Sequence, residues 1–192
     1  MNIKSELITS IKVFMGFSIL LGIIYPLTIT CIAQITMPEK ANGSLIKEKG
    51  VIIGSSLIGQ KFDKPQYFNS RPSAVDYNAA GSGGSNLGPT SKKLITTVEE
   101  RIKVIQKDNN LNKTKKIPAD MVLTSASGID PHISIENATI QIHRISKVRG
   151  ISESKIKELI NKNMDSDFIG IWGQSGVNVL KLNLDLDKIS GK

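Results

Sequence analysis

The chain has 192 residues, enough for one domain of ordinary size beside a membrane anchor. It carries 25 Lys or Arg against 17 Asp or Glu, a formal net charge of +8. Charges of both signs are spread along the chain without a dense basic run, so no nucleic-acid partner is expected, and the excess suits a solvated or lipid-facing surface. Cys31 is the only cysteine, which excludes an intramolecular disulfide and leaves the redox compartment open.

The first predicted element is a membrane span. Residues 13–37 contain no charged side chain, and a helix needs about 20 apolar residues to cross a bilayer. The apolar part of a cleaved signal peptide is shorter, typically about 7–15 residues. The sequence therefore predicts a short tail over 1–12, a retained transmembrane helix over 13–37 with a possible kink site at Pro26, and a soluble domain over 38–192.

The orientation of the span is not decided by charge. The flanking segments on both sides carry a net charge of +1, so the positive-inside bias gives no preference. The short tail makes a cytoplasmic N-terminus the default arrangement. We therefore expect a single-pass protein of the cell membrane whose soluble domain is extracytoplasmic.

The soluble domain opens with apolar segments of strand character at 51–53 and 56–58, punctuated by glycines. A long segment follows over 67–90, in which 13 of 24 residues are Gly, Ser, Asn or Pro and no regular periodicity is present. Loops this long are uncommon in small domains and are either functional or disordered. Because it contains aromatic side chains such as Tyr67 and Phe68, we expect this loop to be ordered and to carry a function.

The later elements alternate between helices and short apolar segments. Helical spacing of apolar residues, with Ser91, Gly150 and Ser152 as caps, predicts three helices over 91–106, 135–147 and 153–163. Residues 121–124 are expected to form a short strand or a buried segment, followed by a second polar loop over 125–131. Alternating Val and Leu over 177–186 predicts a half-buried strand. The fold class is therefore α+β, with a small sheet and about three helices after the anchor.

The glycine-rich part of the long loop has the spacing of a phosphate-binding loop over 83–88. Pro89-Thr90 stand where that motif requires Lys followed by Ser or Thr, so an autonomous P-loop ATPase is not expected. Ser82-Gly83-Gly84 also resembles the Ser-Gly-Gly core of the transport-ATPase signature, but Ser85 replaces its Gln. What remains is an anion-binding turn or a turn that packs on a partner, and the residues alone favour the partner. The adjacent glycines indicate either positive φ angles or close approach of another group.

The remaining polar residues give weaker signals. Arg71 could bridge to a carboxylate or to a phosphate. Asp130-Pro131-His132 is typical of a turn, and the two histidines lack the spacing of a metal site, so no metal is expected. Trp172 is suited equally to the core and to an interface. No aspartyl-phosphate or nucleophile-elbow motif is present in the sequence.

Several ordered blocks resemble one family, the C subunit of the Kdp-type potassium-transporting ATPase of bacteria. The blocks are Gly59–Phe62, Tyr67-Phe68, Arg71–Ala74, Tyr77-Asn78, Ser82–Gly88, Thr124–Ser134, Gln141, Arg144, Arg149-Gly150, Val177–Leu180 and Leu182–Asp187. They extend over nearly the whole chain, which makes the resemblance specific.

The resemblance implies a function that the residues alone do not. In that family a potassium-channel-like subunit selects the ion and a P-type ATPase subunit hydrolyses ATP, while the C subunit supports assembly and ATP binding. It implies these two subunits and the lipid bilayer as partners, ATP as a cofactor shared with the hydrolysing subunit, and no chemistry in this chain. The candidate partner or nucleotide contacts are Arg71, Ser82, Gly83, Gly84, Ser85, Asn86 and Gln141. An independent extracytoplasmic binding domain or an anchored enzyme are the alternatives.

Overall fold

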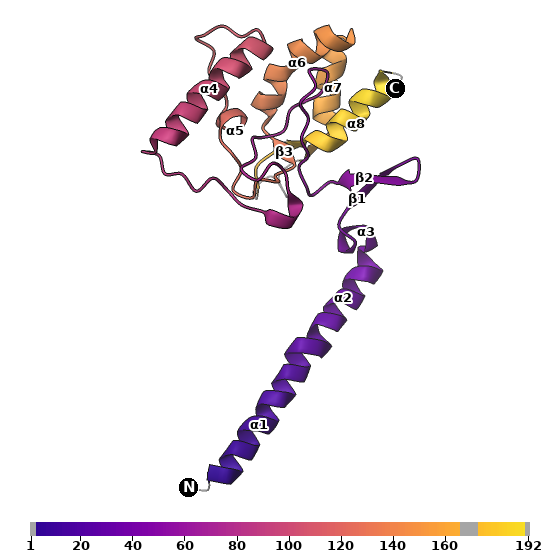
Figure 1. Cartoon of the computed structure of the whole chain (residues 1–192). Helices are drawn as coiled ribbons and strands as arrows, with labels where there is room; N and C mark the ends of the chain where they lie inside the picture. Colours follow the sequence, from indigo (N-terminus) through magenta and orange to yellow (C-terminus); the bar gives the residue numbers. More distant parts are fainter. Residues whose placement is uncertain (1–2, 166–172, 191–192) are drawn as a thin grey trace. The chain divides into compact units, whose positions relative to one another are not determined.

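The computed structural model describes residues 3–165 and 173–190 (Figure 1). Trp172, for which core and interface roles were both expected, lies outside the described residues. The chain divides into two compact units, Met1–Ser55 and Ser56–Lys192. Each is described by itself.

The first unit begins with one long apolar helix. The described residues contain a continuous helix over Ile3–Thr36 that is long and apolar enough to cross a membrane, and none of its most apolar window is buried in the protein. It consists of α1 (Ile3–Ile19), the π-helical turn η1 (Leu20–Ile24) and α2 (Tyr25–Thr36). The wide turn lies directly before Pro26, whose ring crowds the preceding turn and which has no N–H to donate. Residues 3–12 belong to this helix, so most of the predicted tail continues it.

A short helix and a hairpin complete this unit. The helix α3 (Pro38–Ala41) is followed by the antiparallel strands β1 (Leu45–Glu48) and β2 (Val51–Ser55). Lys49 and Gly50 have φ angles of 48° and 82°, as a two-residue hairpin turn with positive φ at both positions requires. The strand predicted at 51–53 is confirmed. The one at 56–58 is wrong, because the chain leaves the hairpin there and the Gly59 N–H donates to the Ile129 carbonyl at 2.7 Å.

The second unit combines helices with a small sheet, which confirms the α+β class. Its elements are α4 (Lys92–Asp108), α5 (Ala119–Val122), β3 (His132–Ile133), α6 (Ile135–Arg149), α7 (Glu153–Lys162), β4 (Met164–Asp165), β5 (Gly176–Asn178) and α8 (Val179–Ile189). The sheet order is β3-β5-β4, and both pairings are antiparallel. A single 3-10 turn, η2 (Ala79–Gly81), interrupts the long loop.

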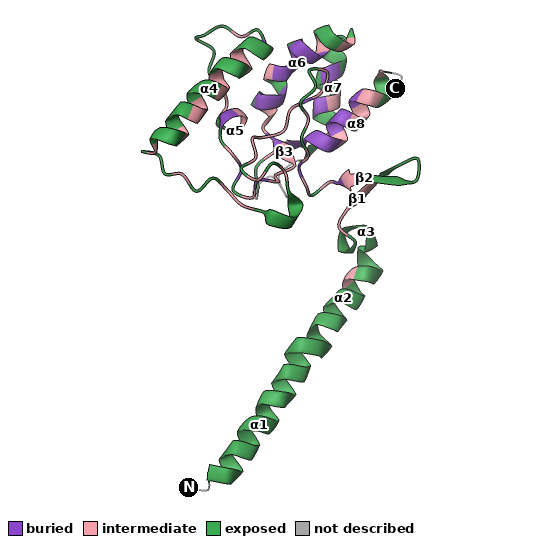
Figure 2. Ribbon diagram, in the orientation of Figure 1, coloured by how far each residue is buried: buried purple, intermediate pink, exposed green. Residues whose placement is uncertain are grey.

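The hydrophobic core lies between α6, α7, α8 and the sheet (Figure 2). Its buried members are Phe68, Ile133, Ala138, Ile142, Ile145, Ile156, Ile160, Val177, Val179, Leu182 and Leu186. Phe68 comes from the long loop and is completely buried. A fully buried aromatic ring stabilises by roughly 1.5–3 kcal/mol, so it fixes the start of that loop to the domain.

The three predicted helices are present. The Ser91 side chain accepts from the Leu94 N–H at the start of α4, and Gly150 ends α6 in the left-handed conformation with φ 67°. One detail differs from the sequence prediction: the Ser152 side chain makes no capping hydrogen bond to α7.

The strand predicted over 177–186 is wrong beyond Asn178. There the chain turns into α8, because the Asn178 side chain caps the helix by accepting from the Lys181 N–H at 3.1 Å. The apolar residues that alternate also recur at helical spacing, and Val179, Leu182 and Leu186 are buried together. Residues 119–122 are helical rather than extended, although Val122 is buried as expected.

Asp185 on α8 makes the domain sensitive to acid. Burial alone would raise its pKa, but hydrogen bonds from Lys162, Lys188 and Asn163 outweigh that effect and lower the pKa to about 2 from 3.8. Its folded pKa is depressed, so its stabilisation is present above pH 3.8 and is lost as the pH falls toward about 2. Because both lysines are exposed, we expect Asp185→Asn to cost about 1 kcal/mol at pH 7. Unfolding of the unmodified chain and of Asp185→Asn in detergent, at pH 7 and near pH 2, measures the difference in their stability. A difference that persists near pH 2 would contradict this prediction.

Candidate functional site

Two polar loops that are distant in sequence lie together in the second unit. We call residues 71–90 and 123–130 the paired loops. The Gly83 N–H donates to the Ser127 carbonyl at 2.9 Å, and the Ser82 hydroxyl donates to the same carbonyl at 3.0 Å. Ser73 donates to the Gly128 carbonyl at 2.6 Å. Gly84 approaches Ala126, and the Ser85 and Thr124 hydroxyls are 3.4 Å apart. Four of the candidate residues, Ser82 to Ser85, therefore lie against the second loop.

The glycines of the first loop are explained by close approach rather than by positive φ. Neither Gly83 nor Gly84 is among the residues with positive φ, whereas Asn86 has φ 52°. A Cβ atom added to Gly84 would lie 3.0 Å from the Ala126 carbonyl oxygen. One added to Gly83 would meet only the Val75 methyl at 3.7 Å, an ordinary contact. Gly84 is therefore the glycine that the pairing requires.

This difference gives a matched pair of substitutions. Gly84→Ala should push the two loops apart and destabilise the domain by about 1–2 kcal/mol, as moderate overpacking does. Gly83→Ala should stay within about 0.5 kcal/mol of the unmodified chain. Thermal melting of the full-length chain in detergent measures both. Equal effects of the two substitutions would show that close approach is not the reason for the glycine.

Arg71 belongs to the first of the paired loops and lines a cavity of about 990 Å³. Its Nη1 donates to the Asp130 carboxylate at 2.8 Å, with each side chain only about one quarter exposed. From the sequence, the partner of Arg71 could be a carboxylate or a phosphate. In the structure Arg71 is paired with the Asp130 carboxylate. The pair neutralises the guanidinium charge, which reduces its attraction for an outside anion.

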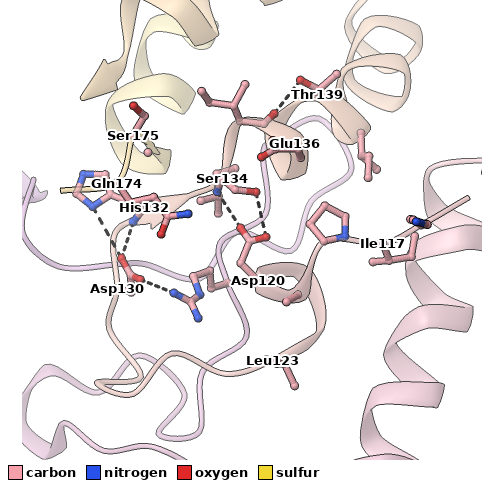
Figure 3. Close-up of a pocket in the computed structure, with 18 of the residues that line it drawn as sticks. Ile117, Asp120, Leu123, Asp130, His132, Ser134, Glu136, Thr139, Gln174 and Ser175 are labelled. Atoms are coloured by element: carbon pink, nitrogen blue, oxygen red, sulfur yellow. Dashed lines mark hydrogen bonds and ion pairs between the residues drawn. The ribbon is translucent and has the colours of Figure 1, made fainter. Parts of the chain in front are cut away.

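Asp130 and Asp120 organise the rest of the cavity wall (Figure 3). Asp130 accepts from the His132 N–H at 2.9 Å, as expected for the turn that Asp-Pro predicts. The His132 Nε2 lies 2.9 Å from Asp165. Asp120 accepts from the Ser134 N–H and from Asn137, which fixes the start of α6. The described residues contain no group of three His, Cys, Asp or Glu side chains that could hold a metal ion.

Gln141 belongs to another set of contacts, at the start of the long loop. Its side chain is 1% exposed. The amide oxygen accepts from the Asn69 N–H at 2.8 Å and from Arg144 at 2.7 Å, and the amide nitrogen donates to Asn137 at 2.7 Å and to the Asn69 carbonyl at 3.3 Å. Two acceptor sites and two donors are the full capacity of a glutamine amide. All the hydrogen-bonding groups of the Gln141 side chain are therefore used within the protein.

Arg144 carries part of the family resemblance, but the sequence analysis gave it no structural role. It is 8% exposed, and its guanidinium donates to the Pro65 and Tyr67 carbonyls and to the side chains of Asn109, Asn69 and Gln141. These acceptors are all neutral. Burial lowers the pKa of Arg144, although Asp108 acts in the opposite direction. The available signal was an arginine three residues after Gln141 on the apolar side of α6.

Comparison with known proteins identifies the family to which the chain belongs. The family model described as the K+-transporting ATPase, c chain, matches residues 7–188. The potassium-transporting ATPase KdpC subunit of Koribacter versatilis is 46% identical over 186 residues, covering 96% of this chain and 95% of the relative. The KdpC subunit of Caldanaerobacter subterraneus is 46% identical over 181 residues, covering 94% of each. That of Mycobacterium tuberculosis is 41% identical over 188 residues, covering 97% of this chain and all of the relative. The chain therefore belongs to the KdpC family, the C chain of potassium-transporting ATPases.

Proposed function

We propose that this chain is the accessory subunit of a high-affinity, ATP-driven potassium uptake pump. It assembles in the bilayer with a potassium-channel-like subunit and a P-type ATPase subunit, assists that assembly, and assists ATP binding by the hydrolysing subunit. The observation that carries the proposal is the family match over residues 7–188, which includes both the apolar helix and the soluble domain. The chain is non-catalytic in this proposal.

The candidate residues of the paired loops suit partner contact better than nucleotide contact, whereas Gln141 is buried and suits neither. A phosphate cradle needs free N–H groups and a nearby cation. Here the Gly83 N–H is bonded to Ser127, Arg71 is paired with Asp130, and the amide of Gln141 is fully used. These residues do not fit an ATP site built by this chain alone. The influence on ATP binding would then pass through assembly with the hydrolysing subunit.

The proposed placement of the domain is outside the cytoplasm, after a single membrane span. This keeps the arrangement expected from the sequence, in which the segment before the apolar run is cytoplasmic. ATP is hydrolysed on the cytoplasmic side in such pumps, so this placement also favours an indirect effect on ATP. It puts the domain on the side from which a channel-like subunit takes up its ion.

Co-purification of the pump through a tag on the P-type subunit tests the proposal. We expect the chain to co-elute, and we expect a pump made without it to be recovered in lower amount and to need more ATP for half-maximal hydrolysis. A chain that elutes alone, together with an unchanged ATP requirement in its absence, would overturn the proposal. Binding of a ligand by the chain when the other subunits are deleted would instead support the independent binding domain.

A further inference from the structure

The membrane helix contains a carbonyl group that the helix itself does not satisfy. The carbonyl of Leu21 would accept from the N–H of residue 25 in an α turn, or from the N–H of residue 26 in a π turn. The Tyr25 N–H donates instead to the Leu20 carbonyl, because η1 is a π-helical turn. Residue 26 is a proline, which has no N–H. Neither donor position therefore serves the Leu21 carbonyl.

The side chains of the span do not supply the missing donor. A Ser or Thr side chain in a helix can donate to the carbonyl four residues earlier, as the Thr28 hydroxyl does to the Ile24 carbonyl at 2.8 Å. The residue four positions after Leu21 is Tyr25. Its hydroxyl is at the far end of the aromatic ring, too far from its own backbone for this bond. The Leu21 carbonyl therefore needs a donor from outside the helix.

This carbonyl lies deep in the bilayer, where water does not satisfy it. The middle of the uncharged run 13–37 is residue 25. At a rise of about 1.5 Å per residue, Leu21 is about 6 Å from that level, whereas the hydrocarbon extends about 15 Å to each side of the bilayer centre. An unsatisfied backbone group is costly in hydrocarbon, and the carbonyls that a proline frees in a membrane helix are satisfied by neighbouring groups. The position therefore calls for a donor from another membrane helix.

Gly22 leaves room for such a helix at the same level. The unsatisfied carbonyl belongs to the peptide bond that joins Leu21 to Gly22. A Cβ atom added to Gly22 would meet no heavy atom within 4 Å, so packing within this chain does not explain the glycine. Leu21 and Ile23 are 60% and 53% exposed, and the span is exposed along its length (Figure 2). Small residues let the backbones of two membrane helices approach closely. The glycine and the open carbonyl thus mark one contact point.

We propose that the Leu21 carbonyl accepts a hydrogen bond from a hydroxyl or amide side chain on a transmembrane helix of the channel-like subunit, with Gly22 as the point of approach. The inference rests on the proposed function and adds the place and chemistry of a contact within the membrane. The channel-like subunit is the neighbour because the soluble domain is proposed to lie on the side from which that subunit takes up its ion, and one chain carries both domain and span. A lipid acyl chain fits beside a glycine but carries no donor for the carbonyl.

A matched pair of substitutions at position 25 tests the hydrogen bond in the assembled pump. Tyr25→Thr places a hydroxyl four residues after Leu21, in the arrangement by which Thr28 serves its own acceptor, so the carbonyl is satisfied within the helix. Tyr25→Val has the same shape without the hydroxyl, and both variants keep Pro26. We expect recovery with a tagged channel-like subunit to be about threefold lower for Tyr25→Thr than for Tyr25→Val, the effect of one interhelical hydrogen bond. Equal recovery of the two variants would overturn the proposal.

Gly22→Leu tests the close approach, and Gly16→Leu is its control. A Cβ atom at either glycine meets no heavy atom of this chain within 4 Å, so the helix itself accommodates both. Because the glycines are six residues apart, they lie on different sides of the helix. We expect recovery to fall about tenfold or more for Gly22→Leu, and less than about twofold for Gly16→Leu, since only a blocked interface separates the backbones. Similar losses for the two variants would overturn the assignment to Gly22.

A photo-crosslinking amino acid at Ser18 identifies the neighbour, because residues four apart lie on the same side of a helix and Ser18 is four residues before Gly22. The expected product joins this chain to the channel-like subunit. Crosslinks to the P-type subunit, to a second copy of this chain or only to lipid would overturn the proposal. The amount of each variant in the membrane should match that of the unmodified chain, so that recovery reports the contact. Failure of the unmodified chain to co-purify with either pump subunit would instead overturn the proposed function.

Discussion

Gly128→Ala is expected to destabilise the domain by about 3 kcal/mol and to separate the paired loops. Gly128 has φ +69°, and an added Cβ would lie 2.6 Å from the Val75 methyl and 2.7 Å from the Gly83 carbonyl oxygen. The left-handed conformation costs a non-glycine residue about 1–2 kcal/mol, and overpacking adds about 1–3 kcal/mol. For a chain of this size the melting midpoint should fall by roughly 6–12 °C.

Gly88→Ala is the matched control for this substitution. Gly88 is in the same loop system, a Cβ atom added to it would meet no heavy atom within 4 Å, and its φ angle is outside the positive range. We expect a change within about 0.5 kcal/mol. If Gly128→Ala and Gly88→Ala melt at the same temperature, the tight packing at Gly128 is not what holds the paired loops together.

Arg144→Met should be the most destabilising of the substitutions considered, with an expected loss of about 3–5 kcal/mol. The guanidinium is buried and occupies five acceptors, among them the carbonyls of Pro65 and Tyr67 and the amide of Gln141. Its removal takes this donor from the Pro65 and Tyr67 carbonyls, while the Gln141 oxygen keeps the Asn69 N–H. Each buried acceptor left unsatisfied costs about 1–3 kcal/mol before relaxation. Thermal melting of the full-length chain measures the loss.

Two further variants show whether the planar geometry of Arg144 matters. Arg144→Lys should recover little of the stability, because an ammonium cannot reach five acceptors in the guanidinium arrangement. Lys147→Met, one turn further along α6 at an exposed position, should be nearly neutral. If Arg144→Lys melts at the same temperature as the unmodified chain, the planar arrangement of the guanidinium donors is not what stabilises the domain.

The same network bears on the proposed nucleotide role of Gln141. A substitution there removes hydrogen bonds to Asn69, Asn137 and Arg144, so any weaker ATP binding by the pump should come with a lower melting temperature of this subunit. Loss of ATP affinity at unchanged stability would favour a direct contact instead.

Local signals predicted the long helices correctly, because caps and apolar spacing act within one segment. Ser91 and Gly150 mark ends of α4 and α6 just as the sequence indicates. The region 177–186 was ambiguous, since its apolar residues satisfy both the strand and the helix period until the capping side chain of Asn178 is considered. Short apolar segments are the usual place for this error.

The site itself depends on contacts that no local pattern contains. Ser82 and Ser127 are 45 positions apart in the sequence, and Arg144 reaches carbonyls in a loop 77 and 79 positions earlier. The sequence did show that the long loop is unusual and that Gly83-Gly84 could allow close approach. It could not show which segment approaches, so the pairing of this loop with the predicted loop at 125–131, and the role of Gly128, emerged only from the structure.

The side of the membrane occupied by the domain tests the account most directly, because a domain outside the cytoplasm can influence ATP binding only through assembly with the hydrolysing subunit. Lys147→Cys, exposed on α6, can be labelled in intact cells with a membrane-impermeant maleimide in a Cys31→Ser background. Lys4→Cys in the N-terminal segment is the opposite-side control. The account predicts labelling at position 147 in intact cells, and at position 4 only after the membrane is opened. Labelling at position 147 only after permeabilisation would place the domain in the cytoplasm and contradict it.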